Sequence, residues 1–540
     1  MGAPREPKGY LALILHAHLP FVRHPENRYH LEELWLFEAI TDTYLPLIEM
    51  MQAWVRDGVR FRMAMSVTPT LASMLGDPFL KKRYVEHLDR MAALARREME
   101  RHRGEPRLFD LARMYRDRFE WARRSFLETH GADILASLKG LQDHGLEIMA
   151  SAATHGYLPL LEPHRAAVRA QILAGIEHHR TVFGRDPKGF WLPECAYFPG
   201  HDEILAAEGI RYTVVETHGV LHAVPRPKYG PYAPVLSPGG VACFPRDVET
   251  SKQVWSAHEG YPGDYDYREF YRDVGHDLPW EEIAPFMPWG VRADTGLKYY
   301  RVTGKTEQKE LYDPERAVRK AKVHAAHFLY NRQLQISRAA GCMDRKPLVV
   351  APYDAELFGH WWFEGPTFLD EVVRGAAAAP DWSLATPSDY LDEYPVLQRV
   401  EVSESSWGYK GYHEVWLDGA NNWIYRHLHE GARRMEELAG RTAGHAAGLV
   451  QRALDQAARE LLLAQSSDWA FIMKSGTAVE YAARRARGHL VNFLRLADEI
   501  ERDAIDAARL AELEDRTRPL EWIRAGAFRS GRPAPAGVLA

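Results

Sequence analysis

The sequence predicts an α/β fold: a barrel of about seven parallel strands, an inserted helical subdomain and a carboxyl-terminal helical domain. Three observations lead to this prediction. Short apolar runs recur between long helical patterns as far as residue 351. A highly charged helical stretch interrupts that alternation at 78–144, and Ala-rich helical periodicity dominates beyond residue 400. At 540 residues the chain is long enough for one large catalytic domain with appendages.

Each expected strand is a short apolar or β-branched run. The runs lie at 10–15, 61–67, 147–151, 189–192, 212–215, 241–244 and 348–351. Polar side chains follow them directly. In strand order these are His16 and His18, Thr68, Thr154 and His155, Glu194, Glu216 and His218, Arg246 and Asp247, and Asp354. Barrel enzymes carry their chemistry at the carboxyl ends of the strands, so these residues are the candidates for a site.

Four regions are expected along the chain. Residues 1–77 and 145–400 form the catalytic barrel. Residues 78–144 are rich in Arg, Glu, Leu and Ala and are interrupted near Gly104, which predicts an inserted helical subdomain rather than a simple crossover. Helical periodicity at 449–464 and 479–516 assigns 401–525 to a carboxyl-terminal helical domain. The Gly- and Pro-rich end predicts a flexible tail at 526–540.

Composition argues against several classes of protein. The net charge is -6 and the charged residues are interspersed, so no basic face indicates a nucleic-acid ligand. No apolar run reaches the roughly 20 residues that a membrane span needs. The 3 cysteines show no metal-ligand spacing, which argues against a disulfide framework or a zinc-cysteine site and favours a reducing cytoplasm. The 15 Trp and 25 Tyr residues suit a carbohydrate ligand.

Two segments place a carboxylate among aromatic rings directly after an expected strand. They are WLPECAY at 191–197, which contains Glu194, and YDAELFGHWW at 353–362, which contains Asp354. Aromatic faces stack on pyranose rings, and two carboxylates that flank a glycosidic bond divide the roles of nucleophile and general acid. The alternative for either segment is a strand end with ordinary core aromatics. Together the two segments favour a site that cleaves a sugar bond.

Five motifs occur in the order characteristic of one family. They are LHAHLP at 15–20, ATHGY at 153–157, WLPECAY at 191–197, the stretch 353–365 and SSDW at 466–469. With them the sequence resembles glycoside hydrolase family 57 over nearly its whole length. The stretches 191–197, 253–263 and 354–365 are most similar to those of 1,4-α-glucan branching enzymes. The resemblance implies an incomplete (β/α)7 barrel with a helical insertion and a carboxyl-terminal helical domain.

The resemblance also implies roles for the two carboxylates. Glu194 is the nucleophile and Asp354 the general acid/base of a retaining transfer through a covalent glycosyl-enzyme. Carboxyl groups in such enzymes lie about 5–5.5 Å apart, and the acid needs a raised pKa to hold its proton until the leaving oxygen takes it. Glu356 and Glu364 compete for the acid role, and Asp354 ranks first because it follows the strand immediately.

His16 and His18 are two positions apart, so on a regular strand they point to the same face and reach the pocket together. With His155 after the third strand, they are predicted to hydrogen-bond sugar hydroxyls. A zinc site with a nearby aspartate is the competing interpretation. No dedicated ligand set emerges from the sequence, so we expect neither a metal nor another cofactor.

Trp255, Trp361, Trp407 and Trp416 are candidate platforms for an α-glucan, worth about 1 kcal/mol each, although any one of them is more often a core residue. The resemblance places Trp255, Trp407 and Trp416 along the donor and acceptor grooves, and Asp468 at the edge of the site.

The Pro- and Gly-rich loop 225–234 is expected to be irregular and exposed. Tyr229 resembles the family's loop tyrosine, which covers the site so that a sugar hydroxyl, rather than water, meets the glycosyl-enzyme. Tyr232 is the alternative.

The resemblance thus implies a branching enzyme that acts on an α-glucan polysaccharide such as amylose or glycogen, with no nucleic-acid or membrane partner. An α-amylase or 4-α-glucanotransferase of the same family would share the carboxylates and differ in product linkage. A metal-dependent deacetylase or mannosidase would need a metal-ligand set. A non-catalytic glucan-binding protein would be favoured if the carboxylates were missing.

Overall fold

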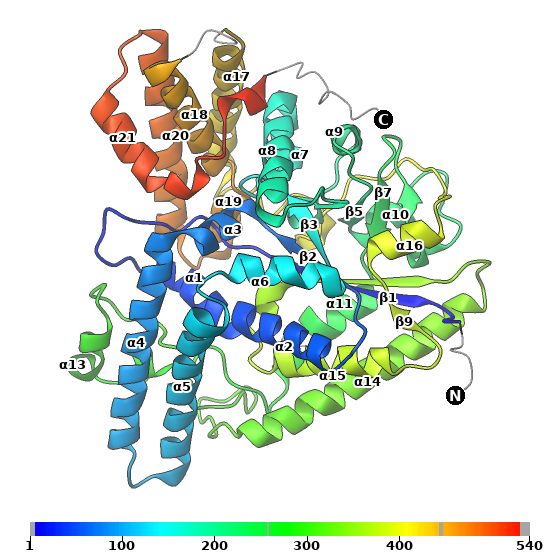
Figure 1. The fold of residues 1–540 in the computed structure, drawn as a ribbon, viewed down its shortest axis with the longest axis vertical. Coiled ribbons are helices and arrows are strands. Elements are labelled where there is room, and N and C mark those ends of the chain that lie inside the picture. The colour runs from blue at the N-terminus through cyan, green and yellow to red at the C-terminus, as the bar shows by residue number, and fades with distance from the viewer. Residues whose placement is uncertain (1–5, 256–258, 442–446, 530–540) are drawn as a thin grey trace.

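A curled sheet lies at the centre of the protein, which is represented by a computed structural model that describes residues 6–255, 259–441 and 447–529 (Figure 1). Its strands follow the order β6-β7-β5-β4-β3-β2-β1-β8, with β9 paired to β1. The strands of the barrel wall are β1 (Tyr10–Ala17), β2 (Met63–Val67), β3 (Leu146–Ser151), β4 (Gly189–Trp191), β5 (Tyr212–Val215), β7 (Ala242–Pro245) and β8 (Leu348–Asp354). Every run predicted from sequence is one of these strands, and neighbours along the wall are parallel, which confirms the α/β barrel.

The barrel is incomplete on one side. Within the described residues, no strand ladder joins β7 to β8, the two ends of the parallel wall. A backbone hydrogen bond of 2.8 Å from Asp247 to Val350 crosses this gap, which we call the seam. Two further strands, β6 (Val235–Leu236) and β9 (Ser383–Leu384), pair with β7 and β1. Each has two residues, too few to form a recognisable apolar run in the sequence.

Alternate residues of each strand point into the barrel, where Ile14, Met149 and Val350 belong to one apolar cluster. The intervening residues, such as Leu13 and Val349, belong to a second cluster with the surrounding helices. Because both faces are covered, the strands read as continuous apolar runs rather than alternating ones. Towards the carboxyl ends, the inward rows change from apolar to polar residues.

Helices cover the outside of the wall (Figure 1). They include α1 (Glu33–Ala39), α2 (Leu45–Arg56), α3 (Pro69–Gly76), α8 (Arg165–Phe183), α11 (Val248–Trp255), α14 (Pro314–Ala340), α15 (Gly365–Ala377) and α16 (Pro387–Glu393). The long helix α14 begins where the side chain of Asp313 accepts a hydrogen bond from Arg316 N and Pro314 occupies the first turn. It packs against α15 and β8 and borders the seam.

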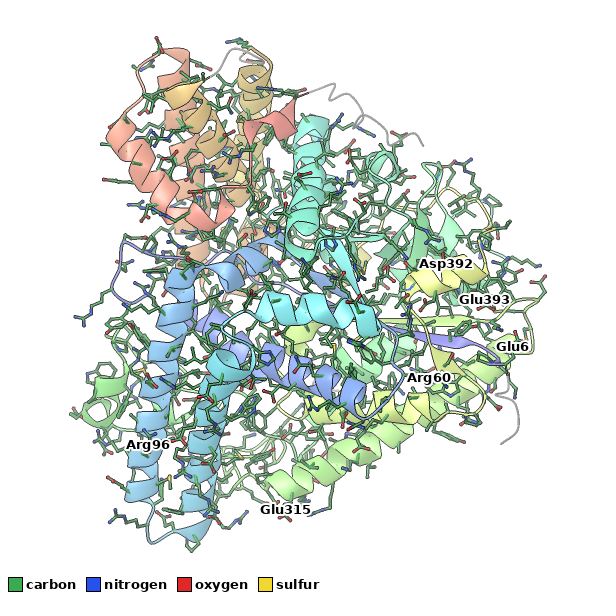
Figure 2. All side chains as sticks on the ribbon, viewed as in Figure 1. Glu6, Arg60, Arg96, Glu315, Asp392 and Glu393 are labelled. Atoms are coloured by element: carbon green, nitrogen blue, oxygen red, sulfur yellow. The ribbon has the colours of Figure 1, made fainter. Side chains whose placement is uncertain are left out.

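Between β2 and β3, α4 (Pro78–Arg101) and α5 (Pro106–Arg124) form a hairpin that projects from the barrel (Figure 1). Asp77 caps α4 by accepting a hydrogen bond from Phe79 N. Arg96 on α4 carries its charge at the surface, where its side chain is 55% exposed (Figure 2). The hairpin covers residues 78–124 of the charged stretch at 78–144, and the later helix α6 (Ile134–Leu141) packs against α2 and α3.

A second excursion, residues 259–313, leaves the barrel between β7 and α14 and was not predicted as a separate unit. It contains the short helices α12 (Val274–Asp277) and α13 (Trp280–Ile283). It packs on the α4–α5 hairpin, where Tyr115 Oη donates to Lys298 O at 2.7 Å. Its few regular elements leave little periodicity for a sequence pattern to detect.

Helices make up most of the described part of the carboxyl-terminal region (Figure 1). They are α17 (Tyr425–Arg441), α18 (Gly448–Ala464), α19 (Ser467–Ser475), α20 (Val479–Glu501) and α21 (Ala507–Arg516). The chain then packs through η13 (Ala525–Phe528), where Phe528 is 1% exposed. The packed chain therefore continues past residue 526, the predicted start of the tail, and 530–540 lie outside the described residues. No helix of the described chain combines the length and apolar character that crossing a membrane requires.

Candidate active site

The strand register brings the first candidate residues together. His16 on β1 pairs with Asp354 on β8 and with Ser66 on β2. Since Ile14 and Val350 line the barrel interior, His16 and Asp354, two and four residues further along their strands, point to the same side. The polar site therefore lies on top of the apolar barrel core, at the carboxyl ends of the strands.

Glu194 lies in a tight turn, η5 (Pro193–Cys195), directly after β4. Its φ of 62° is left-handed, and Cys195 has φ 50°. Left-handed backbone at a residue with a Cβ costs on the order of 1–3 kcal/mol and persists where the surroundings enforce it, often at active sites. Here the turn aims the Glu194 side chain, which is 17% exposed, across the strand ends.

Two groups from distant segments hold the Glu194 carboxylate. Trp407 Nε1 donates to Oε2 at 2.7 Å and Ser467 Oγ donates to Oε1 at 3.2 Å. Burial raises the pKa of Glu194, and the Trp407 hydrogen bond opposes that shift, as do nearby His18 and the Ser467 hydroxyl. These donors favour the ionised form that a nucleophile needs.

Burial also acts on Asp354, but its neighbours differ from those of Glu194. Burial raises its pKa well above the ordinary value, and the carboxyls of Glu356 and Glu194 raise it further, while Arg246 acts against them. A raised pKa lets an aspartic acid keep its proton to higher pH, as a general acid requires. The pKa of both carboxyl groups is raised, but only Glu194 accepts hydrogen bonds that act to lower it.

Glu356 and Glu364, the competitors for the acid role, each accept hydrogen bonds from neighbouring groups. Glu356 accepts hydrogen bonds from Tyr44 Oη at 2.5 Å and from His18 N at 3.2 Å, and burial raises its pKa to about 7. Glu364 accepts from Tyr312 Oη at 2.6 Å and from the backbone of the second excursion. Glu364 therefore fastens that excursion to the barrel.

The three predicted histidines form one stack. The rings of His18 and His155 lie 3.8 Å apart, and His16 Nε2 is 3.1 Å from His155 Nε2. Burial lowers the pKa of His16 and His155 well below the ordinary value, so both are neutral. Burial also acts to lower the pKa of His18, but Asp468, with its carboxylate oxygens 3.0 and 3.1 Å from His18 Nε2, raises it overall. His18 thus supplies a positive charge near Glu194, which helps keep that carboxyl ionised.

These histidines do not assemble with carboxylates as a ligand set. Within the described part of the chain, no group of three or more His, Cys, Asp or Glu residues could hold a metal ion. His155 Nδ1 instead pairs with Ser467 Oγ at 2.9 Å, and His16 Nδ1 with Ser66 Oγ at 3.2 Å. Their ring nitrogens are used in positioning the stack.

The four tryptophans that were predicted as platforms differ in their exposure and in their neighbours. Trp407 bonds the Glu194 carboxylate, and the ring of Trp255 lies edge-on to that of Trp407 at a centroid distance of 6.1 Å. Trp361 is 54% exposed and stacks on Phe270 at 4.6 Å, so its outer face is available to a ligand. Trp416 is 1% exposed and stacks on Tyr157 at 4.2 Å. Its prediction as a platform is corrected, because a ring enclosed in this way presents no face to a sugar.

Tyr229 is also placed differently from the prediction. Its hydroxyl donates to Asp344, and its ring centroid lies 4.9 Å from the cationic groups of both Lys228 and Arg345. Asp344 precedes β8, whereas Asp354 ends it, and a strand of 7 residues spans about 20 Å. In this arrangement the loop covers the seam and not the carboxylates. The lid role expected for Tyr229 is not met by this geometry.

Two residues of the site, Ser467 and Tyr44, were not singled out from the sequence, whereas Arg246, which lies near Asp354, was one of the strand-end candidates. Ser467 bonds both Glu194 and His155 and belongs to the motif at 466–469. Tyr44 had no such signal. It ends a π-helical turn, η1 (Ile40–Tyr44), of the kind that is frequent at functional sites.

A prediction follows from the Trp407 hydrogen bond. Because this bond lowers the pKa of Glu194, replacing Trp407 with phenylalanine should raise that pKa. Glu194 must be ionised to attack, so the acidic limb of the kcat/KM profile should move to higher pH. Trp255→Phe is the matched control, since Trp255 contacts Trp407 but does not bond the carboxylate. An unmoved acidic limb in Trp407→Phe would show that this hydrogen bond does not set the ionisation of the nucleophile.

The chain is similar to known protein families, to curated relatives and to solved structures. Residues 12–403 match the model of glycosyl hydrolase family 57, and residues 427–528 match that of the carboxyl-terminal domain of 1,4-alpha-glucan branching enzymes. The chain is 41% identical to the alpha-amylase AmyC of Thermotoga maritima, whose solved structure has a TM-score of 0.90 and coverage of 96% of this chain and 99% of that chain. It is 34% identical to the branching enzyme of Thermococcus kodakarensis over 97% of this chain and 79% of that protein. The solved branching enzyme of Pyrococcus horikoshii is 34% identical, with a TM-score of 0.87 and 98% of each chain covered.

Proposed function

The chain belongs to glycosyl hydrolase family 57, and we propose that it works as a 1,4-alpha-glucan branching enzyme that cleaves an α-1,4 bond and rejoins the freed segment through an α-1,6 bond. One observation carries this function. The region that matches the branching-enzyme carboxyl-terminal domain supplies Ser467 to the nucleophile and Asp468 to His18. That domain is therefore part of the catalytic centre.

The proposed reaction has two displacements. In the first, Glu194 attacks the anomeric carbon of the donor while Asp354 gives its proton to the departing 4-oxygen, and a glycosyl ester forms on Glu194. In the second, the Asp354 carboxylate takes the proton of an acceptor 6-hydroxyl, whose oxygen attacks the same carbon and releases Glu194. Two inversions leave the α configuration unchanged.

The electrostatic setting of each residue supports its proposed step. Asp354 starts protonated because of burial and neighbouring carboxyls, whereas Glu194 receives three stabilising neighbours, Trp407, Ser467 and His18. When Glu194 becomes an ester, it loses its negative charge, and one of the causes that raise the Asp354 pKa disappears. The pKa of Asp354 falls at the stage at which it must act as a base.

Hydrolysis is the second candidate, since the similarity to an alpha-amylase structure reaches 41% identity. Both activities share the first displacement and differ in whether water or a sugar hydroxyl attacks the ester. The match at residues 427–528 favours transfer. Amylose or glycogen is the proposed substrate, and glycogen formation in a reducing cytoplasm is the proposed setting, which the free cysteines Cys195, Cys243 and Cys342 support.

Product analysis separates the two activities. Incubation with amylose should form new α-1,6 linkages in large excess over new reducing ends, because transfer conserves the number of glycosidic bonds. The α-1,6 anomeric protons are counted by NMR and the ends by a reducing-sugar assay. Reducing ends that rise while α-1,6 linkages stay absent would identify an amylase, and new α-1,4 products without either change would identify a 4-α-glucanotransferase.

A further inference from the structure

A cleft lies over the seam, apart from the carboxylates. The loop that contains η6 (Gly230–Tyr232) packs against both β7 and β8, where an additional wall strand would otherwise close the barrel. Between this loop and the second half of α14 is a hollow of about 470 Å³. That volume lies in the range of about 300–1,000 Å³ occupied by small-molecule sites. We call it the seam cleft.

Two tyrosines supply the aromatic lining of the seam cleft. Tyr229 and Tyr232 both border it. Tyr229 is fixed in orientation, since Asp344 accepts its hydroxyl and the cations of Lys228 and Arg345 lie 4.9 Å from its ring centroid. A ring held in this way loses little conformational entropy when a ligand stacks on it.

The polar lining offers acceptors and donors that are already oriented. Glu249, with a side chain 53% exposed, is anchored by the fully buried Arg332. Gln335 donates through Nε2 to Asp247 at 2.7 Å, while its Oε1 is buried with no hydrogen-bond partner among the described residues. Arg338 contributes donors and forms no ion pair within the described chain. The Glu249 carboxylate and the Arg338 guanidinium suit a ligand with many hydroxyl groups, each of which both donates and accepts, and the buried Gln335 Oε1 is an acceptor without a partner among the described residues.

Two of the charged side chains that line the seam cleft are neutralised by ion pairs. Lys228 pairs with Asp344 at 2.5 Å, and Arg332 pairs with Glu249 at 2.5 Å. A polyanion would meet Glu249, and a cation would meet Arg338, so the lining favours a neutral ligand. Aromatic rings combined with planar polar groups around a neutral hydroxyl-rich ligand are the chemistry of carbohydrate recognition.

We propose that the seam cleft is a second, non-catalytic binding site for an α-1,4-glucan chain, an inference that rests on the proposed glucan substrate. A polymer bound at two places on one protein has a high effective concentration at the second place. The cleft also shares a segment with the catalytic centre, because Asp247 follows Arg246, one of the groups that set the Asp354 pKa. The seam cleft thus retains long donor or acceptor chains on the flank of the barrel whose strand ends carry the carboxylates.

The chain contains a reporter for this test. Cys342 lines the seam cleft and is exposed, whereas Cys195 and Cys243 are buried. Alkylation of Cys342 by iodoacetamide is followed by mass spectrometry in the Glu194→Gln variant, so that the ligand is not consumed. Maltohexaose at about ten times its Kd should slow the reaction by about tenfold, because only the unoccupied fraction reacts. Cellohexaose, which has β-1,4 bonds, should not protect.

Two matched double variants on α14 test whether the protection of Cys342 arises from a ligand in the seam cleft. Asn331→Ala with Arg338→Ala removes two lining side chains and should abolish protection. Arg319→Ala with Gln333→Ala alters two exposed positions of the same helix outside the cleft, the first of them one turn after Glu315 (Figure 2), and should retain it. Alanine is favourable in a helix, so both pairs should fold. For each variant, the rate of Cys342 alkylation with maltohexaose is divided by the rate without it. This ratio cancels any direct effect of Arg338 on the reactivity of the thiol.

In otherwise unmodified enzyme, the cleft pair should raise the apparent KM for long amylose by about tenfold, with kcat and the KM for maltohexaose unchanged. Unprotected Cys342, protection that survives the cleft pair, or an unchanged amylose KM would overturn the second site. Alkylation does not depend on turnover, so the two proposals fail separately. If maltohexaose protects Cys342 but no α-1,6 linkages form, only the branching activity is refuted. If branches form but Cys342 is not protected, only the second binding site in the seam cleft is refuted.

Discussion

Glu194→Gln is expected to lower glucan transfer by about 10³-fold or more, since an amide cannot form the glycosyl ester through which both displacements pass. The substitution keeps the size of the side chain and leaves a carbonyl oxygen to accept from Trp407 Nε1. The fold should therefore survive. Branch formation from amylose is measured by NMR, and the melting temperature is recorded alongside it.

Glu364→Gln is a matched control for this loss. Glu364 is a buried glutamate on the same side of the barrel, and its hydrogen bonds fasten the second excursion rather than a reacting group. Glu364→Gln should keep most of the transfer activity and affect chiefly the melting temperature. Full transfer by Glu194→Gln would assign the nucleophile to another carboxylate.

Asp354→Asn should reduce transfer from amylose by about 10²–10⁴-fold, the usual contribution of a general acid. Its loss should be far smaller on maltosyl fluoride, because fluoride departs without a proton. In the unmodified enzyme the raised pKa of Asp354 keeps the acid protonated as pH increases, so the basic limb of kcat/KM lies well above an ordinary aspartate pKa.

The same basic limb should vanish for maltosyl fluoride in Asp354→Asn, since no titrating acid remains. Comparison of the two substrates in both proteins decides the assignment. Equal losses on amylose and on the fluoride would show that Asp354 acts on something other than the leaving group, and would direct attention to Glu356.

The barrel was predictable because its signal is local. A strand covered on both faces is an apolar run whichever strands it later meets, so all the runs of the wall could be located in the sequence. The residues at the strand ends followed from topology, because parallel strands bring their carboxyl ends to one rim. This is why the sequence alone could place His16, His155, Glu194 and Asp354 in one candidate site.

Contacts between segments that lie far apart in the sequence were harder to predict. Trp407 and Trp416 look alike in sequence, yet one bonds the nucleophile and the other is enclosed against Tyr157. Hydrophobic pattern reports burial but does not say which segments meet. The excursion at 259–313 lacked periodicity altogether. The position of Tyr229 depends on a hydrogen bond to Asp344, and neighbouring Lys228 forms an ion pair with the same carboxylate, contacts that no local pattern encodes.

The nucleophile's partners have a consequence for the order in which activity arises during synthesis. Trp407 and Ser467 lie 213 and 273 residues after Glu194 in the chain. A nascent barrel that has left the ribosome up to Asp354 holds Glu194 and Asp354 but lacks both donors to the Glu194 carboxylate. The hydrogen-bonded site is therefore complete only after the segments that carry Trp407 and Ser467 have packed against the barrel.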